Sequence, residues 1–235
     1  MTSVLALTCP IEAKASVLND LEHIDSLGDM DLESRVRTVL ESICAVGLSK
    51  ILAVDRQHKH FNMPADGILP VYTKTLNPDI VEFSIVPSTI PPDCFPFSFG
   101  FWNGEFVVTS VFEPNSVPAL LKENLATLIG KPDALESVLR VISEMGMEKY
   151  IGLSFRLDEA LGVADGVHHL NEKTFSNCSQ LLQVCQGASP DKSENSIITS
   201  WTSDSDETQR PFMRGCWRYC EWGPIKGHVT YHKTD

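Results

Sequence analysis

The stretch Phe97-Ser-Phe-Gly-Phe-Trp-Asn-Gly-Glu-Phe-Val-Val-Thr-Ser-Val-Phe112 decides how the middle of this 235-residue chain folds. Asn103-Gly104 separates two runs rich in aromatic and β-branched residues, and a type I′ turn favours this dipeptide because both central positions need positive φ. The turn predicts a β-hairpin with three pairs of facing residues: Phe101 with Phe106, Phe99 with Val108, and Phe97 with Ser110. Large apolar side chains then share one face of the hairpin, which indicates a core that other elements cover.

The composition is that of an acidic globular protein. The chain is 43% hydrophobic and 21% charged, with a formal net charge of −12 and an isoelectric point near 5.0. Nucleic acids and anionic membranes bind basic surfaces, so we expect no nucleic-acid partner and no membrane partner. No run approaches the ~18 apolar residues of a membrane helix. Residues 1–10 are briefly apolar but lack the preceding Lys or Arg of a signal peptide.

The seven cysteines favour a reducing compartment. Their number is odd and they are scattered along the chain, as Cys9, Cys44, Cys94, Cys178, Cys185, Cys216 and Cys220. Without an export signal, such cysteines are expected to be reduced thiols rather than a disulfide framework. The sequence therefore predicts a cytoplasmic protein.

Helical periodicity alternates with short extended runs along the chain. Helices are expected over residues 11–29, 31–46, 117–129 and 132–146, the third capped by Ser116 and the second and fourth ended by Gly47 and Gly146. Strands are expected over residues 51–54, 68–75, 80–86, 149–155, 196–201, 213–222 and 226–233. The last two strands form a hairpin around Gly223-Pro-Ile225. Residues 177–185, taken alone, have the pattern of a helix.

An internal repeat emerges when the sequence is shifted by 99 residues. Twelve of the 64 positions from 39 to 102 are then identical, including Ala65-Asp-Gly67 on 164–166, Lys74-Thr75 on 173–174, and Trp102 on Trp201. The expected elements also correspond, except that residues 80–86 read as a strand and their counterparts as a helix. A chance match of helix–Gly–strand patterns is the alternative explanation.

The repeat predicts an α+β fold built from two similar helix-plus-antiparallel-sheet units in tandem, packed as a pseudo-dimer. The first unit covers residues 1–114 and the second 115–235, unless both belong to one continuous domain. Residues 196–222 then correspond to the central hairpin, with a long polar loop in place of its tight turn.

The final hairpin carries the residues most suggestive of a metal. With Trp217 opposite Tyr231, Cys216 lies across from His232, and Cys220 across from His228, all on one sheet face. Cys and His are zinc ligands. However, residues four apart on a strand are ~13 Å apart, so the two pairs do not converge on one ion and each needs a further ligand. A Cys–His nucleophilic site and a solvated or partner-covered sheet face are the alternatives.

His168 and His169 are the second candidate, as ligands or acid–base catalysts. The repeat aligns them with Leu69-Pro70, so only the second half has them. The structural alternative is a strand start with one exposed His and one hydrogen-bonded His. A third candidate is a ligand pocket lined by Phe97, Phe99 and Phe101.

No phosphate-binding loop, dinucleotide-binding glycine motif, nucleophile elbow or His-Glu-x-x-His motif occurs in the sequence. The aromatic-rich sheets and the duplication favour a non-catalytic binding module for a protein or a small apolar ligand. The alternative is a metal- or Cys/His-dependent enzyme with its site in the second half. A metal ion is the only cofactor that the residue pattern suggests.

Overall fold

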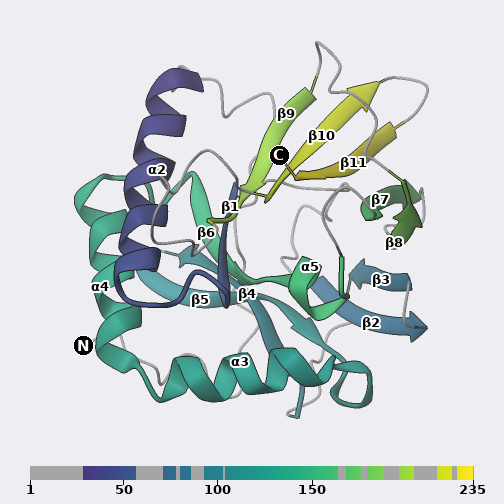
Figure 1. Ribbon diagram of the computed structural model, residues 1–235, viewed down its shortest axis with the longest axis horizontal. Helices are drawn as coiled ribbons and strands as arrows, with labels where there is room; N and C mark the ends of the chain where they lie inside the picture. The colour runs from purple at the N-terminus through teal and green to yellow at the C-terminus, as the bar shows by residue number, and fades with distance from the viewer. Residues whose placement is uncertain are drawn as a thin grey trace.

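The computed structural model describes residues 29–56, 71–77, 80–85, 93–102, 104–163, 168–175, 179–187, 196–203, 216–223 and 227–234. Within these residues, eleven strands close into one β-barrel, and helices pack outside it (Figure 1). The helices are α2 (Asp29–Ala45), η2 (Pro114–Ser116), α3 (Ala119–Ile129), α4 (Pro132–Glu144) and α5 (Leu157–Ala160). The strands are β1 (Leu52–Arg56), β2 (Val71–Asn77), β3 (Ile80–Ile85), β4 (Phe95–Trp102), β5 (Glu105–Phe112), β6 (Ile151–Phe155), β7 (His168–Phe175), β8 (Ser179–Gln186), β9 (Ser196–Trp201), β10 (Cys216–Gly223) and β11 (Gly227–Thr234). Helices and antiparallel strands together confirm the α+β class.

The barrel order interleaves strands from both ends of the chain. It runs β1-β6-β4-β5-β2-β3-β8-β7-β11-β10-β9, and β9 pairs with β1 to close the ring. The pairs are antiparallel except for β2 with β5, which is parallel. Strands on the two sides of the predicted boundary at residues 114/115 therefore pair with each other, at β1–β6, β4–β6, β1–β9 and β3–β8. The division into two domains stays a prediction.

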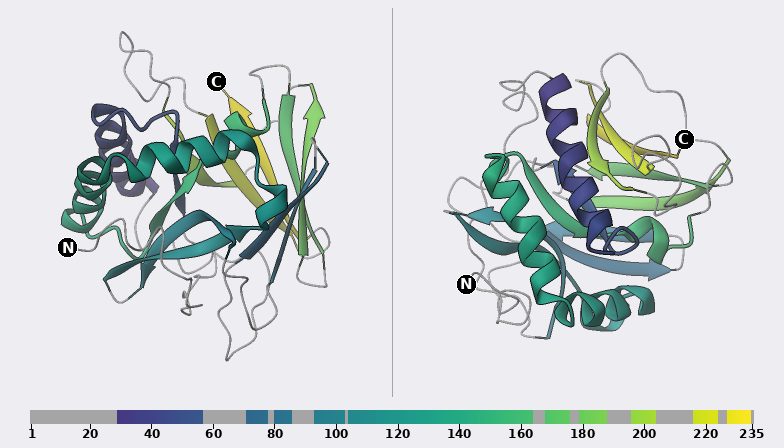
Figure 2. Two further views of the ribbon diagram at one scale, coloured as in Figure 1. Left: turned by 90° about the horizontal axis from the view of Figure 1, so that it is seen from below. Right: turned by 60° about the vertical axis from the view of Figure 1, so that its left-hand side comes forward.

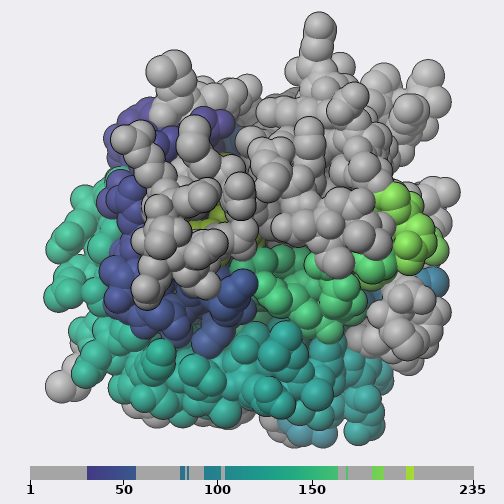
Figure 3. All heavy atoms as spheres, in the orientation of Figure 1, coloured from purple at the N-terminus to yellow at the C-terminus, as the bar shows by residue number. Residues whose placement is uncertain are grey.

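The long helices lie on one side of the barrel. Figure 2 shows α2, α3 and α4 gathered there in both views, and their atoms form the left and lower parts of the face in Figure 3. Arg35 of α2 donates a hydrogen bond from Nη1 to the Met145 carbonyl at the end of α4, at 2.7 Å. The apolar stripe of α4, from Leu135 to Ile142, is buried as the 3.6-residue periodicity predicts.

Helices α2 and α4 end in the same way, 99 residues apart. Gly47 and Gly146 adopt φ of 68° and 65°. This is the left-handed conformation in which many helices end, and glycine adopts it most easily. After α2, the Gly47 amide bonds to Cys44 O at 2.9 Å and the next amide to Ile43 O at 3.0 Å. After α4, the corresponding bonds from Gly146 and Met147 are 2.9 and 3.0 Å long. Both helix ends predicted from glycine are confirmed.

Two cross-strand pairs join residues that are also 99 positions apart. Val54 of β1 pairs with Leu153 of β6, and Glu82 of β3 pairs with Leu181 of β8. In each pair, a strand therefore meets its own counterpart under the 99-residue shift, in antiparallel orientation. Under the 99-residue shift, no described strand of the first half corresponds to β11, which pairs with β7. In the first half, β2, the counterpart of β7, pairs directly with β5.

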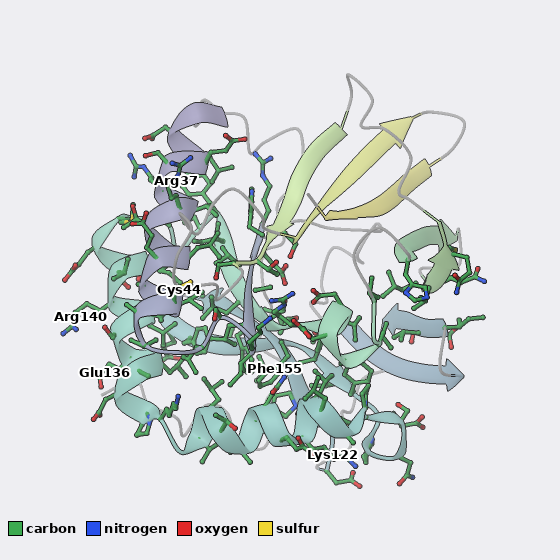
Figure 4. All side chains as sticks on the ribbon, in the orientation of Figure 1. Arg37, Cys44, Lys122, Glu136, Arg140 and Phe155 are labelled. Carbon is green, nitrogen blue, oxygen red and sulfur yellow. The ribbon has the colours of Figure 1, made fainter. Side chains whose placement is uncertain are left out.

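The barrel wall has two chemically different faces. Val54, Leu153 and Phe155 are in the hydrophobic cluster that contains the buried residues of α2 and α4, and Phe155 lies between the helices and the strands in Figure 4, so we take this face as the outer face of β1 and β6. The cluster also extends to Val81 and Leu182. Successive residues of a strand point to opposite faces. Ala53, Ser154 and their cross-strand neighbours therefore form the inner face. In Figure 4, Phe155 lies between the helices and the strands, whereas Glu136 and Arg140 extend from α4 away from the barrel.

Two predictions of local structure are wrong. Residues 179–186 form β8 rather than a helix, because β3 and β7 pair with it on either side, and its side chains alternate between buried Leu182 and exposed Gln183. Ser116 does not cap α3; Pro118 occupies the N-cap, and the Ser116 hydroxyl donates to the Glu113 carbonyl in η2.

The central hairpin is confirmed, with one local shift. Phe101 pairs with Phe106 and Phe99 with Val108 as predicted, but irregularities next to Ser98 place that residue, not Phe97, opposite Ser110. The extra residue of a bulge changes the register on one side of it only. Gly104 has φ of 79°, in agreement with the predicted turn.

The final hairpin is confirmed with a register shifted by two residues. Tyr219 pairs with Tyr231, and Arg218 rather than Cys216 lies opposite His232. Likewise Trp222, not Cys220, lies opposite His228. A shift of two residues leaves every residue on its predicted face but gives it a new partner. The helix predicted over residues 11–29 and both Ala-Asp-Gly turns lie outside the described residues.

Candidate functional site

The inner face of the barrel is the surface on which the chemistry-bearing residues converge. Residues paired across strands share a face, so the cross-strand pairs show which residues of each strand lie on the inner face. One route runs from β6 through β4, β5 and β2, and the other from β1 through β9, β10, β11 and β7. Both routes assign Val81 of β3 and Leu182 of β8 to the inner face.

Hydroxyl groups line the inner wall at β6, β4 and β5. Ser154 pairs with Ser98, and Ser98 pairs with Ser110. The Ser98 hydroxyl is hydrogen-bonded to those of Ser110 and Thr109, the latter at 3.1 Å. Ser154 and Ser110 are only 2% and 4% exposed. Because these serines are small, they put no bulky side chain on this part of the inner wall, whereas the outer face of the same strands carries large apolar side chains.

Aliphatic side chains line the inner wall at β3 and β8. Val81 and Leu182 pair directly and are 0% and 1% exposed. Glu172 of β7 is paired with Leu182, and Thr230 of β11 is paired with Glu172. This row therefore leads from buried aliphatic residues to an acidic position in adjacent strands.

A second row of paired residues crosses four strands and includes residues of opposite charge. Asp55 of β1 pairs with Ser200 of β9, Ser200 with Arg218 of β10, and Arg218 with His232 of β11. Ser200 is buried and Asp55 is half-buried. Since neighbouring strands lie about 4.8 Å apart, the Asp55 and Arg218 positions are roughly 10 Å apart. The row therefore brings Asp, Arg and His positions together on the inner face.

A buried ion pair lies directly after the end of β6. Arg156 Nη2 donates to Asp158 Oδ2 at 2.6 Å, and these side chains are only 5% and 11% exposed. Arg156 Nη1 also donates to the Ser49 carbonyl at 3.3 Å, and Nη2 lies 3.3 Å from Glu159 Oε1. The guanidinium thus ties the loop before β1 to helix α5, which is a structural role.

The three phenylalanines predicted as ligand contacts belong to the hydrophobic core. Phe97 and Phe99 are 5% and 3% exposed, and Phe101 packs against the same cluster. Phe99 stacks on Phe106 with ring centroids 5.3 Å apart and meets Phe155 edge-on at 5.8 Å. A role for these three residues in ligand binding stays a prediction.

The predicted Cys and His candidates separate by face. Cys216 and Cys220 occupy inner-face positions with Arg218, because they lie two residues from it on β10, whose pairing with β11 is regular, and His228 and His232 share that face. His168 begins β7 on the face of Glu172, is half-buried, and is opposite Gln186. His169 occupies the outer face. The strand pairing therefore assigns His168 and the four predicted metal ligands to inner-face positions of the barrel.

Sequence reasoning missed Asp55, Glu172, Arg218 and Arg156. Each is a charged residue in or beside a strand, and such residues usually face solvent. Only closure of the barrel makes the positions of Asp55, Glu172 and Arg218 internal. The signal in the sequence was weak: an acid and a base interrupt the otherwise apolar or hydroxyl-bearing face of short strands.

Cys94, at the start of the segment that leads into β4, is a thiol with a perturbed acidity. Burial raises the pKa of Cys94 to about 11, and the nearby Asp93 and Glu113 carboxylates act in the same direction. The thiolate is therefore disfavoured, which makes Cys94 a poor nucleophile. Among the residues whose side chains the structure describes, no three His, Cys, Asp or Glu groups could hold a metal ion together.

Comparison with known proteins gives no assignment: no family model, no curated protein and no solved structure matches this chain. None of the helices in the described ranges has the length and hydropathy needed to cross a bilayer. The geometry of the barrel is therefore the basis for a functional proposal.

Proposed function

We propose that this protein is a non-catalytic binding module that holds a small, largely apolar ligand inside its β-barrel. The observation that carries the proposal is the closure of eleven strands around an inner face of small hydroxyl and aliphatic side chains. Eight strands enclose an interior that the barrel's own side chains just fill, and the diameter grows with the number of strands. An eleven-stranded barrel is correspondingly wider.

The exterior of the described residues favours a small ligand in the interior over a protein partner on the surface. In the closed ring, each described strand is paired on both sides, which removes the free edge that an added strand would need. The large hydrophobic side chains exposed in the described residues are Leu120 and Ile129. They are nine residues apart on α3, so they lie on opposite sides of the helix and form no patch.

The inner face favours a ligand with an apolar body and a polar end. Val81 and Leu182 supply an aliphatic wall, and Ser98 and Ser110 supply hydroxyls. The Asp55–Arg218 row adds charged positions. Ligand sites commonly combine a mainly apolar lining with a few placed polar groups.

We further propose that the two halves arose by internal duplication and pack as a pseudo-dimer. The matched helix ends at Gly47 and Gly146 support it. So do the pairs Val54–Leu153 and Glu82–Leu181, because a twofold axis relating the halves would pass through both. We place the module in the cytoplasm, where Cys44, Cys94 and Cys185 would remain free thiols.

The second candidate function is a metal- or Cys/His-dependent enzyme. It is favoured by one observation: His168, Cys216, Cys220, His228 and His232 all occupy inner-face positions of β7, β10 and β11. In that case His168 would serve as the acid–base group. A turnover that is lost in His168→Gln but kept in His169→Gln would favour this function over passive binding.

A thermal-shift screen tests the binding proposal. The panel should contain alkyl carboxylic acids and alcohols of several chain lengths, with short-chain members as matched controls that keep the polar group. A ligand at 100 times its Kd should stabilise the protein by about 2.7 kcal/mol. We expect stabilisation to grow with chain length until the tail fills the interior. Stabilisation by no member, or equally by short and long members, would contradict the proposal.

A further inference from the structure

Strands β9, β10 and β11 form a three-stranded sheet that is paired more extensively within itself than with the rest of the barrel. Among the described residues, eight pairs join β10 to β11, and five join β9 to β10. At the borders of this sheet, three pairs join β11 to β7, and two join β9 to β1. We call these three strands the terminal sheet; they lie together at the upper right of Figure 1. Because backbone hydrogen bonds accompany the pairs, the two borders hold fewer of them than the interior does.

The β4–β5 hairpin is joined to its neighbours by equally few pairs, but its side chains hold it in place. In the described strands, two pairs join β4 to β6, and three join β5 to β2. Across the first border, the rings of Phe95 and Phe99 contact that of Phe155, with centroids 5.9 and 5.8 Å apart. Aromatic contacts of this kind contribute about 0.5–1.5 kcal/mol each beyond their buried area. Opening of the barrel at this hairpin is therefore disfavoured.

The border between the terminal sheet and β1 is held by residues at and after the end of β9. Trp201, which pairs with Val54, is 6% exposed and belongs to the hydrophobic cluster. Ser203 is fully buried, and its hydroxyl accepts a hydrogen bond from Cys44 Sγ of α2 at 2.9 Å. These contacts fix the end of β9 against the helix. Movement of the terminal sheet would therefore separate β11 from β7 rather than β9 from β1.

The border between β7 and β11 lies next to the aliphatic part of the inner wall. Leu182 of β8 is 1% exposed and pairs with Glu172 of β7. Glu172 in turn pairs with Thr230 of β11. A ligand can reach the inside of a closed ring only when the ring opens at some point. Separation of β7 from β11 would open the interior one strand away from Leu182.

We propose that the terminal sheet is a gate, which turns about the buried end of β9 and opens the barrel between β7 and β11 to admit the ligand. This inference rests on the proposed function, because a gate serves a ligand that enters the interior. The opening breaks the three residue pairs of that border and leaves the eight pairs between β10 and β11 intact. It is therefore a local opening, which costs less free energy than unfolding of the whole barrel.

Hydrogen exchange of single amides, measured by NMR on the full-length protein without ligand, tests the gate by itself. Amides that donate across the β7–β11 border should exchange about 10-fold faster or more than amides that donate between β10 and β11, because the local opening exposes only the former. Equal protection on the two sides of β11 would overturn the proposal. Since this measurement needs no ligand, its result separates failure of the gate from failure of the proposed function.

Two cysteine pairs that share one substitution provide the matched variants for a ligand experiment. Val229→Cys with Lys173→Cys joins β11 to β7, because these two residues are paired. Leu181→Cys with Lys173→Cys joins β8 to β7 and leaves the border able to open. Each oxidised variant is compared with its own reduced form, which controls for any effect of the substitutions on the fold. The disulfides are identified by peptide mass spectrometry. If the control pair oxidises and the border pair does not, the pairing on which the gate depends is contradicted.

Stopped-flow binding of the tightest alkyl acid or alcohol from the thermal-shift panel, followed by tryptophan fluorescence, gives the rates. Oxidation of the border pair should slow association by about 10-fold or more, because binding requires the gate to open. Dissociation should slow as well, so that the Kd changes little. Oxidation of the control pair should leave both rates unchanged. An unchanged association rate in the oxidised border variant would overturn the gate and leave the proposed function standing.

Discussion

At the scale of single residues, the guanidinium of Arg156 is buried and held by several partners. It pairs with Asp158 at 2.6 Å, and it also binds the Ser49 carbonyl from another part of the chain. Both side chains are nearly inaccessible to water. The pair therefore fixes the relative position of the loop before β1 and the start of α5, at a place where an unmatched charge would be costly.

Arg156→Met should destabilise the protein by about 3–5 kcal/mol, because it leaves the buried Asp158 carboxylate without this partner. Replacing both members, as Arg156→Met with Asp158→Leu, should recover much of that loss. Lys50→Met is the control, since Lys50 contacts Glu159 at 3.6 Å while 60% exposed, and should cost at most about 0.5 kcal/mol. Urea unfolding measures all three. A cost for Arg156→Met no larger than that of Lys50→Met would contradict the buried-pair account.

The acidity of Cys94 gives a prediction with a defined pH dependence. Its raised pKa, about 11, means that the thiol stays neutral at physiological pH and ionises only in alkaline solution. The rate of alkylation by iodoacetamide, followed by peptide mass spectrometry, should rise about tenfold per pH unit from pH 8 to 10. In urea the same thiol should titrate near 8.5. A rate that levels off below pH 9 in the folded protein would be inconsistent with this environment.

At the scale of elements, the two glycine-terminated helices are the features that sequence and structure share most closely. The apolar stripes of α2 and α4 show a period near 3.6, and each helix ends where a glycine can adopt positive φ. These are local rules, which is why the sequence alone predicted both helices. The Asn103-Gly104 hairpin was predictable for the same reason.

Gly47→Ala and Gly146→Ala should each destabilise the protein by about 1 kcal/mol, because a Cβ atom disfavours the left-handed conformation. No atom lies within 4 Å of a Cβ built on Gly146, so its cost should be conformational and not steric. Gly130→Ala is the matched control, since Gly130 has a helical φ of −72°. Its effect should be within about 0.5 kcal/mol. Equal costs at all three positions in thermal unfolding would argue against this explanation.

Elements defined by distant partners were not predictable. The pattern of residues 177–185 predicts a helix, and only pairing of β8 with β3 and β7 makes residues 179–186 a strand. The register of β10 on β11 depends on the turn geometry, which a Gly-Pro turn does not fix in the sequence. That two-residue difference changes the cross-strand partners: Cys220 lies opposite Thr230, and His228 lies opposite Trp222.

At the scale of the whole molecule, the barrel is shared between the two predicted units. β1 pairs with β6 and β9, and β4 pairs with β6, so strands of one half complete the sheet of the other. The sequence predicted the α+β class, and the candidate residues of the second half stay a prediction. It could not predict closure, because nothing local indicates which strand edges meet. Closure is what turns Asp55, Glu172 and Arg218 into inner-face residues.

Fragments 1–114 and 115–235, expressed separately, should each lack a cooperative unfolding transition, because each would expose the strand edges that the other half covers. Mixed after denaturation, they should associate and regain the near-ultraviolet dichroism of the full chain. Calorimetry and gel filtration check both expectations. A cooperative transition in either fragment alone would instead favour two independent domains.

The central claim is that the interior of the eleven-stranded barrel is the binding site. A crystal structure of the full-length protein with the tightest ligand from the alkyl panel tests it most directly. The account predicts ligand density inside the barrel, with the apolar body against Val81 and Leu182 and the polar end toward the Ser98–Ser110 hydroxyls or the Asp55–Arg218 row. Ligand density confined to the outer surface or to the helices, with the interior filled by the protein's own side chains, would contradict it.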